Sequence, residues 1–114
     1  MDKPAIDINE ATIKNFVETL RPTDPEIRKK LDVGYSYDGK VAMLYEIRPV
    51  WNDPEKIQNI EFAKISINKT QMEWSLYWKR ASGKWESYSA FPKSTRLDQI
   101  LQAIKDDPHG CFFG

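Results

Sequence analysis

Between residues 31 and 91, apolar and polar side chains alternate along the chain, and this alternation constrains the fold more than any other feature. A period of two residues is typical of β-strands that bury one face. The dipeptide Asp38-Gly39 lies between the first two alternating segments, where it is a strong signal for a β-hairpin. Turn residues at 68–71 and 81–83 divide the remainder. The sequence therefore predicts about five strands, in the segments LDVGYSY, KVAMLYEIRPVW, NIEFAKISIN, MEWSLYWKR and KWESYSAF.

Prolines set the expected limits of two of these strands. Pro49 and Pro54 lie on either side of Trp51, and proline cannot donate a hydrogen bond inside a sheet. The second strand is therefore expected either to end near Arg48 or to continue as an edge strand. Pro92 is expected to end the fifth strand.

Helical periodicity replaces the alternation before residue 31. Asn9 is the expected N-cap of a first helix, with Thr12 as a weaker alternative, and Pro22 and Pro25 are expected to end it. A short helical piece is expected over 26–31, with Pro25 suited to its first turn. The apolar stripe of the first helix is Ile13, Phe16, Val17 and Leu20.

A last amphipathic helix is predicted near the C-terminus. Ser94 or Thr95 is its expected N-cap, and Asp107 and Pro108 are expected to end it. Its apolar stripe is Leu97, Ile100, Leu101 and Ile104.

The order helix, strands, helix predicts an α+β fold. Short links favour an antiparallel meander of about five strands, with the N-terminal and C-terminal helices packed on one face. The other face of such a sheet can remain exposed to water. A chain of 114 residues fits a single domain over residues 1–114.

Alternation also assigns side chains to the two faces of the predicted sheet. The face expected to meet the helices holds Val41, Met43, Tyr45, Ile47, Ala63, Ile65, Ile67, Met72, Trp74, Leu76 and Trp78. The face expected to remain open holds Leu44, Glu46, Arg48, Lys64, Ser66, Tyr77, Lys79, Glu86 and Tyr88.

Composition and charge narrow the class of partner. The chain has 17 basic and 17 acidic residues, so no overall positive charge attracts nucleic acid or an anionic membrane. Its single cysteine excludes an intrachain disulfide. The start of the chain has no apolar segment typical of a signal peptide, and no apolar run is long enough to span a membrane. A cytoplasmic location is therefore expected.

Several uncommon motifs resemble those of a bacterial family of short proteins, the domain of unknown function three-zero-two-four. The likeness extends from Phe16 to Gly114. The resemblance implies a single domain that ends at Gly114, and it implies no activity, substrate or cofactor. The matching residues are Glu46 to Pro49, Trp51, Tyr77, Trp78, Arg80, Ala81, Lys84, Trp85, Tyr88 and Gly110 to Gly114.

The C-terminal sequence DPHGCFFG contains the only histidine and the only cysteine of the chain, His109 and Cys111. Two residues apart, they lie on one face of an extended segment, so a thiol nucleophile with an imidazole base is one interpretation. A metal site lacks further soft ligands, and the residues after Cys111 fit a prenylation signal poorly. The interpretation we favour is a structural tail that fills the core, formed by Gly110, Cys111, Phe112 and Phe113.

A second candidate site is the predicted open face together with the hairpin between the last two strands. Basic and aromatic side chains there are typical of surfaces that bind acidic peptides or stack bases. A ladder of solvated ion pairs is the alternative without function. The candidate surface is Glu46, Arg48, Trp51, Lys64, Tyr77, Lys79, Arg80, Lys84, Trp85, Glu86 and Tyr88.

These observations favour a small non-catalytic module that binds a protein through the open face or the hairpin. The sequence contains no phosphate loop, metal-ligand spacing or nucleophile motif, so no cofactor and no metal are expected. One alternative is a small enzyme that uses Glu46 with Arg48 or Lys64, or the pair His109 and Cys111. Others are weak binding of single-stranded nucleic acid and self-association through an edge strand.

Overall fold

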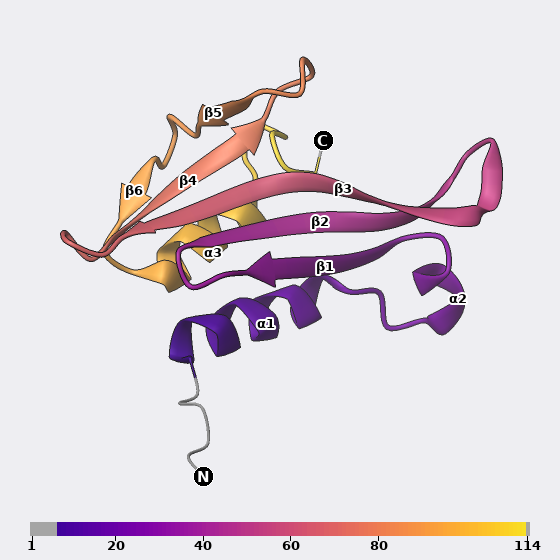
Figure 1. The fold of residues 1–114 in the computed structure, drawn as a ribbon, viewed down its shortest axis with the longest axis horizontal. Helices are drawn as coiled ribbons and strands as arrows, with labels where there is room; N and C mark the ends of the chain where they lie inside the picture. The colour runs from indigo at the N-terminus through magenta and orange to yellow at the C-terminus, as the bar shows by residue number, and fades with distance from the viewer. Residues whose placement is uncertain (1–6, 114) are drawn as a thin grey trace, which may run out of the picture.

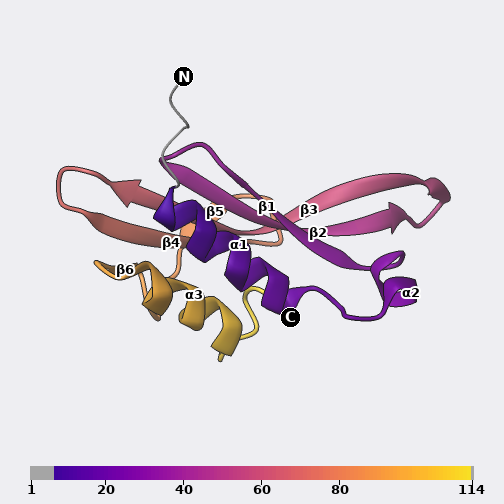
Figure 2. The ribbon, with the colours of Figure 1, turned by 90° about the horizontal axis from the view of Figure 1, so that it is seen from below.

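The structure is a computed structural model that describes residues 7–113. One antiparallel sheet crosses the molecule, and two helices cover one of its sides (Figures 1 and 2). The expected α+β fold with a meander is confirmed: the strand order is β1-β2-β3-β4-β5, and a short β6 pairs with β4 beside β5. The helices are α1 (Ile8–Leu20), α2 (Pro25–Arg28) and α3 (Leu97–Asp106). The strands are β1 (Asp32–Tyr37), β2 (Val41–Val50), β3 (Asp53–Asn68), β4 (Glu73–Lys79), β5 (Trp85–Ser87) and β6 (Lys93–Ser94).

The N-caps differ from those expected. Asp7 caps α1, and its Oδ1 accepts the backbone N–H groups of Asn9 and Glu10 at 2.9 and 3.2 Å. Asn9 and Thr12 therefore lie inside α1, since a cap two residues earlier satisfies the first amides. The N-cap of α3 is Arg96, whose side chain makes no capping bond, so neither Ser94 nor Thr95 holds that position.

The core lies between the sheet and the two longer helices (Figure 2). Ile13 and Val17 of α1 are buried, and so are Ile100 and Ile104 of α3, as their helical spacing predicts. The sheet contributes three rows of paired residues, and side chains opposite one another share a face. These rows are Leu44, Ala63 and Trp78; Ala42, Ile65 and Leu76; and Ile67 and Trp74.

The predicted faces were wrong for β2. Ala42 and Leu44 are fully buried beneath the helices, whereas Met43 is only half-buried and faces the other way. Strands β3 and β4 keep the predicted faces, with Ile65 and Leu76 buried, but Met72 lies in the turn before β4 and is exposed. The predicted face of β5 was also wrong, because Glu86 stands opposite Trp78 on the helix side. The cause in β2 is pairing: Leu44 stands opposite Tyr35 on β1 and Ala63 on β3, so the even-numbered residues of β2 share the buried face. Beyond Leu44 the register with β3 shifts, and β3 carries an extra residue, Phe62. The members of β2 that lie on the open face are Val41, Met43, Tyr45 and Ile47.

Three predicted strands have different lengths. β3 begins at Asp53, before the predicted start at Asn59, and includes Pro54. β2 continues through Pro49 to Val50, as the edge-strand alternative expects, because β1 pairs only as far as Ile47. The predicted fifth strand is shortened to β5, which ends at Ser87 and not at Pro92 as expected. Residues 88–92 leave the sheet, and β6, which was not predicted, follows them. The backbone of Leu76 holds both ends of this excursion, since its carbonyl accepts from Tyr88 N at 2.9 Å and its N–H donates to Pro92 O at 3.0 Å.

An ion pair joins the end of α1 to the start of β1. Arg21 Nε and Nη2 donate to Asp32 Oδ1 and Oδ2 at 2.9 and 3.0 Å, a bidentate geometry. The Arg21 hydrogen bonds are the main cause that lowers the pKa of Asp32, and the N–H of Val33 adds to this.

We expect Asp32→Asn to lose most stability near neutral pH and less in acid. A lowered folded-state pKa stabilises the native state above the ordinary aspartate pKa, and this contribution disappears as the pH falls through the folded-state pKa. Urea midpoints of the wild type and the variant from neutral pH to pH 2 measure the difference. A difference between the two proteins that does not shrink in acid would contradict this role of the pair.

No helix among the described residues is both long and apolar enough to cross a membrane.

Candidate functional site

Two lysines and two aromatic rings pair across the strands on the open face, the side of the sheet away from α1 and α3. Lys64 of β3 lies opposite Tyr77 of β4, and Lys79 of β4 lies opposite Trp85 of β5. The Nζ atoms lie 5.1 Å from the Tyr77 ring centroid and 5.7 Å from the Trp85 centroid. Both distances are within the range of cation–π attraction. We call Lys64, Tyr77, Lys79 and Trp85 the lysine–aromatic platform.

Side chains of β2 and β3 extend the platform toward β1. Glu61 Oε1 lies 3.9 Å from Lys79 Nζ, and Tyr45 stands opposite Glu61. Met43 stands opposite Lys64. The open face therefore carries rows in which apolar, acidic, basic and aromatic groups are neighbours, and these rows lie on strands rather than on mobile loops.

The ring of Tyr45 lies against the backbone of β1. A Cβ atom on Gly34 would come within 2.7 Å of Tyr45 Cε2, so only glycine permits this approach. The Tyr45 hydroxyl donates to the carbonyl of Tyr35 at 3.4 Å. These contacts orient the Tyr45 ring across β1 at the margin of the open face.

The turn between β4 and β5 adds two further basic groups beside the platform. Arg80 N donates to Lys84 O at 2.8 Å, and Gly83 has a φ of 87°, a left-handed conformation that suits glycine. Lys84 is exposed, and Arg80 Nε lies 3.9 Å from Glu86 Oε2. Lys84 is therefore the exposed basic group at this end of the platform, whereas Arg80 is paired with Glu86.

Two predicted surface residues, Arg48 and Trp51, lie on the arm, which is the part of the β2–β3 hairpin that extends past β1 and β4 (Figure 1). A third, Glu46, lies just before the arm, opposite Val33 of β1. Glu46 and Arg48 face the helix side of the sheet and pair with each other at 3.2 Å. Trp51, at the tip, is 90% exposed. Glu46 therefore cannot act together with Lys64, because their side chains lie on opposite faces. Self-association through the free edge of this arm stays a prediction.

Two further predicted surface residues also lie on the helix side. Glu86 stands opposite Trp78, whose face meets α3. Tyr88 is 3% exposed, and its ring centroid lies 4.9 Å from that of Phe112. Of the predicted surface, the platform therefore keeps Lys64, Tyr77, Lys79 and Trp85, and Arg80 and Lys84 lie beside it at the turn. The residues that lie elsewhere are Glu46, Arg48, Trp51, Glu86 and Tyr88.

Sequence reasoning missed Tyr45, Met43 and Glu61 as members of the open face. The hairpin at Asp38-Gly39 could have located Tyr45 and Met43, because an even-numbered loop pairs odd with even residues. Tyr35 and Leu44 then share one face, which leaves Met43 and Tyr45 on the other.

The C-terminal tail folds back on the core. Asp107, in the left-handed conformation with φ 36°, ends α3. Its carboxylate accepts the N–H groups of Phe112 and Phe113 at 3.1 and 2.8 Å. Phe112 is 5% exposed, whereas Phe113 is 46% exposed and lies 5.3 Å from the ring of Phe62. Gly114, the last residue of the family motif, lies outside the described residues.

The thiol in this tail has the wrong electrostatics for a nucleophile. Cys111 is half-buried, and burial raises its pKa, with Asp107 and Glu86 raising it further. His109 is exposed, and within residues 7–113 no hydrogen bond joins it to Cys111. In the same range no group of three or more His, Cys, Asp and Glu residues is placed to hold a metal ion.

We expect thiol reagents to modify Cys111 slowly at neutral pH, at least about tenfold more slowly than in the unfolded protein, because the thiolate is the reactive form. Absorbance at neutral pH, with and without urea, gives the two rates. Native and unfolded rates that are equal would restore the nucleophile interpretation.

The family model described as Domain of unknown function (DUF3024) matches residues 1–114. The chain belongs to this family. The family description assigns no activity to the chain. No curated protein and no solved structure matches the chain.

Proposed function

We propose that this protein of the DUF3024 family is a non-catalytic binding module whose lysine–aromatic platform engages an acidic segment of another protein. The observation that carries the proposal is the pairing of Lys64 with Tyr77 and of Lys79 with Trp85 on a sheet face without a covering helix. Aromatic side chains rotate about only two torsion angles, so they offer a large contact area and lose little conformational entropy on binding. Lysines add charge complementarity to an acidic partner.

Shape supports binding over catalysis. None of the platform residues lines the pockets described along the helix side and the β1 edge. Small substrates are held in concave sites, so a surface outside these pockets suits a protein segment better. Groups that an enzyme would need to bring together, Glu46 and Lys64, lie on opposite faces.

Charge supports an acidic partner. Lys64 forms no ion pair with any described residue, whereas Lys79 and Lys93 on the same face are balanced by Glu61 and Glu73 at 3.9 Å. Because these two ion pairs are long, Lys79 and Lys93 are only weakly held and can turn toward a carboxylate of a partner. Basic groups therefore outnumber acidic ones on this face, with Lys64, Lys79 and Lys93 against Glu61 and Glu73, and Lys84 is exposed at the nearby turn.

The test is a selection of phage-displayed peptides against the wild type, followed by affinity measurements with the double variant Lys64→Glu/Lys79→Glu. We expect acidic peptides with aromatic or aliphatic residues to be enriched. Reversal of both charges should weaken their binding at least tenfold, which corresponds to about 1.4 kcal/mol. Trp85 fluorescence and amide chemical shifts locate the bound peptide.

The matched control is Lys14→Glu/Lys30→Glu, which changes the net charge equally at exposed positions away from the platform. It should retain binding. Peptides without acidic residues, or equal losses in both double variants, would contradict the proposal. Tighter binding of an oligothymidylate strand with a steep salt dependence would instead indicate a nucleic-acid binder.

A further inference from the structure

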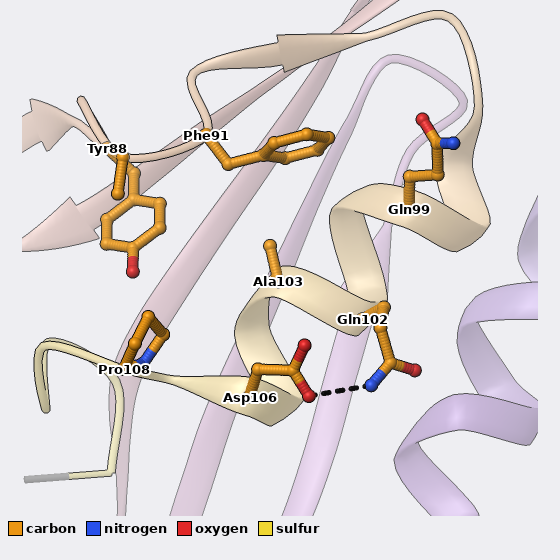
Figure 3. Close-up of a pocket in the computed structure, with 8 residues that line it drawn as sticks. Tyr88, Phe91, Gln99, Gln102, Ala103, Asp106 and Pro108 are labelled. Carbon is orange, nitrogen blue, oxygen red and sulfur yellow. Dashed lines mark hydrogen bonds between the residues drawn. The ribbon is translucent and has the colours of Figure 1, made fainter.

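A groove of about 400 Å³ lies on the helix side of the molecule, between α3 and the excursion at residues 88–92. Figure 3 shows Tyr88 and Phe91 of the excursion on one side and the exposed stripe of α3 on the other. Its volume falls within the range of small-molecule sites, about 300–1,000 Å³. The groove is separate from the lysine–aromatic platform, which occupies the opposite face of the sheet.

The spacing of residues in α3 creates the groove. Gln99, Gln102, Ala103 and Asp106 recur at helical intervals, so they share one stripe, while the apolar stripe enters the core. Ala103 lies in the middle of the polar stripe, and its small side chain leaves room opposite the ring of Phe91 (Figure 3). The floor and one wall are therefore apolar, and polar groups stand at the two ends.

The polar groups are arranged by neighbouring side chains. Gln102 Nε2 donates to Asp106 Oδ1 at 2.7 Å, which orients the carboxylate. Ser94 Oγ donates to Gln99 Oε1 at 2.8 Å, which leaves the amide NH₂ of Gln99 as a donor. Gln99 and Asp106 are seven residues apart, about 10 Å along the helix axis.

Charge in the groove has one sign. Asp106 is the only charged residue among those that line it, and no described basic residue forms an ion pair with this carboxylate. A carboxylate beside aromatic rings favours a positively charged ligand, through direct pairing and through cation–π attraction.

Tyr88 supplies a second and independent observation. Its hydroxyl is buried without a hydrogen-bond partner, the one such side-chain atom among the described residues. An unpaired buried hydroxyl is costly, so a partner from outside the chain would be favourable. In Figure 3 the hydroxyl is directed toward Pro108, at the end of the groove where Asp106 also lies. Burial raises the pKa of Tyr88, with Cys111 and Asp107 contributing, so the phenol is neutral at physiological pH.

We propose that this groove binds an organic amine with a flat apolar body. The ammonium group lies at the end near Asp106 and Tyr88, the apolar body lies between Phe91 and Ala103, and Gln99 donates to an acceptor at the far end. The amine comes from a free small molecule or from a lysine side chain of a peptide, since both present the same chemistry.

The experiment is a titration of the full chain with phenethylamine, followed by amide chemical shifts and calorimetry. 2-Phenylethanol has the same shape without the charge, and 3-phenylpropionate has the opposite charge. We expect the amine to bind at least fivefold more tightly than the alcohol and to shift the amides of Phe91 and Ala103. N-acetyl-Phe-Lys-amide distinguishes the sources: tighter binding than phenethylamine indicates a peptide, and weaker binding indicates a small molecule.

Three variants test the roles of the residues. Ala103→Leu should fill the groove and reduce amine affinity more than tenfold, and Asp106→Asn should remove the preference for amine over alcohol. Tyr88→Phe should weaken amine binding without lowering thermal stability, because the hydroxyl has no partner in the chain. Asp98→Asn removes a carboxylate from the same helix outside the groove and should retain binding.

Failure of all three compounds to shift Phe91 or Ala103 overturns the proposal, as does equal affinity for amine and alcohol. A lower melting temperature for Tyr88→Phe, with unchanged affinity, would assign the hydroxyl a structural role and remove it from the site. None of these results depends on the peptide selection that tests the platform.

Discussion

Leu44→Asp is expected to unfold the protein, whereas Met43→Asp is expected to leave it folded. Leu44 is fully buried beneath the helices and stands opposite Ala63, so aspartate there would place a charge without a partner in the core. Such a substitution costs more than about 4 kcal/mol, comparable with the whole stability of a small domain. Met43 stands opposite Lys64 on the open face, where aspartate gains a cation as neighbour and should change the stability by less than about 1 kcal/mol.

Far-UV circular dichroism and urea titration of the two variants measure this contrast. The substitutions are adjacent and introduce the same group, so their difference reports only the direction of each side chain. A folded Leu44→Asp protein together with an unfolded Met43→Asp protein would reverse the faces of β2 and remove Met43 and Tyr45 from the open face.

This contrast also shows where sequence reasoning succeeded and where it stopped. Alternation predicted β3 and β4 correctly because one set of their side chains is apolar and the other is largely polar. In β2 both sets contain apolar groups, so alternation alone cannot choose between Met43 and Leu44. Pairing across Asp38-Gly39 makes that choice, since Tyr35 stands opposite Leu44. In β2, therefore, strand pairing and not side-chain size determines which of Met43 and Leu44 is buried.

Other differences arise from features that no local pattern carries. The extra residue of β3 at Phe62 changes the register between β2 and β3, and a bulge of this kind leaves no periodic signal. The excursion at residues 88–92 depends on hydrogen bonds to Leu76, a residue distant in sequence. The amine groove exists because of this excursion, so the sequence could predict the stripe of α3 but not the wall that faces it.

The platform was predictable in part. Lys64, Tyr77, Lys79 and Trp85 lie on strands whose faces alternation assigned correctly, apart from Trp85, whose place follows from its pairing with Lys79. Glu46 and Arg48 were assigned to the same surface because β2 was given the wrong face. The observed face of β2 therefore takes Glu46 and Arg48 away from Lys64, so Glu46 and Lys64 do not act together, whereas Glu46 and Arg48 remain paired on the helix side.

Phe112→Ala is expected to cost about 3–5 kcal/mol of the free energy of unfolding, the range for removal of a buried phenylalanine side chain. Phe112 is 5% exposed and packs against Tyr88, which itself belongs to the core. Asp107 holds the amides of Phe112 and Phe113, so the ring enters the core with its backbone already oriented.

Phe113→Ala is the matched control, because it removes the same atoms from the next residue. Phe113 is 46% exposed and contacts Phe62 at the margin of the core, so we expect a loss of about 1 kcal/mol or less. Urea unfolding followed by tryptophan fluorescence gives both values. Equal and small losses in the two variants would show that the tail does not contribute to the core. A large loss of stability in Phe112→Ala alone means that α3, the tail and the edge of the sheet unfold together. The groove between α3 and residues 88–92 then persists only while the tail is packed on the core.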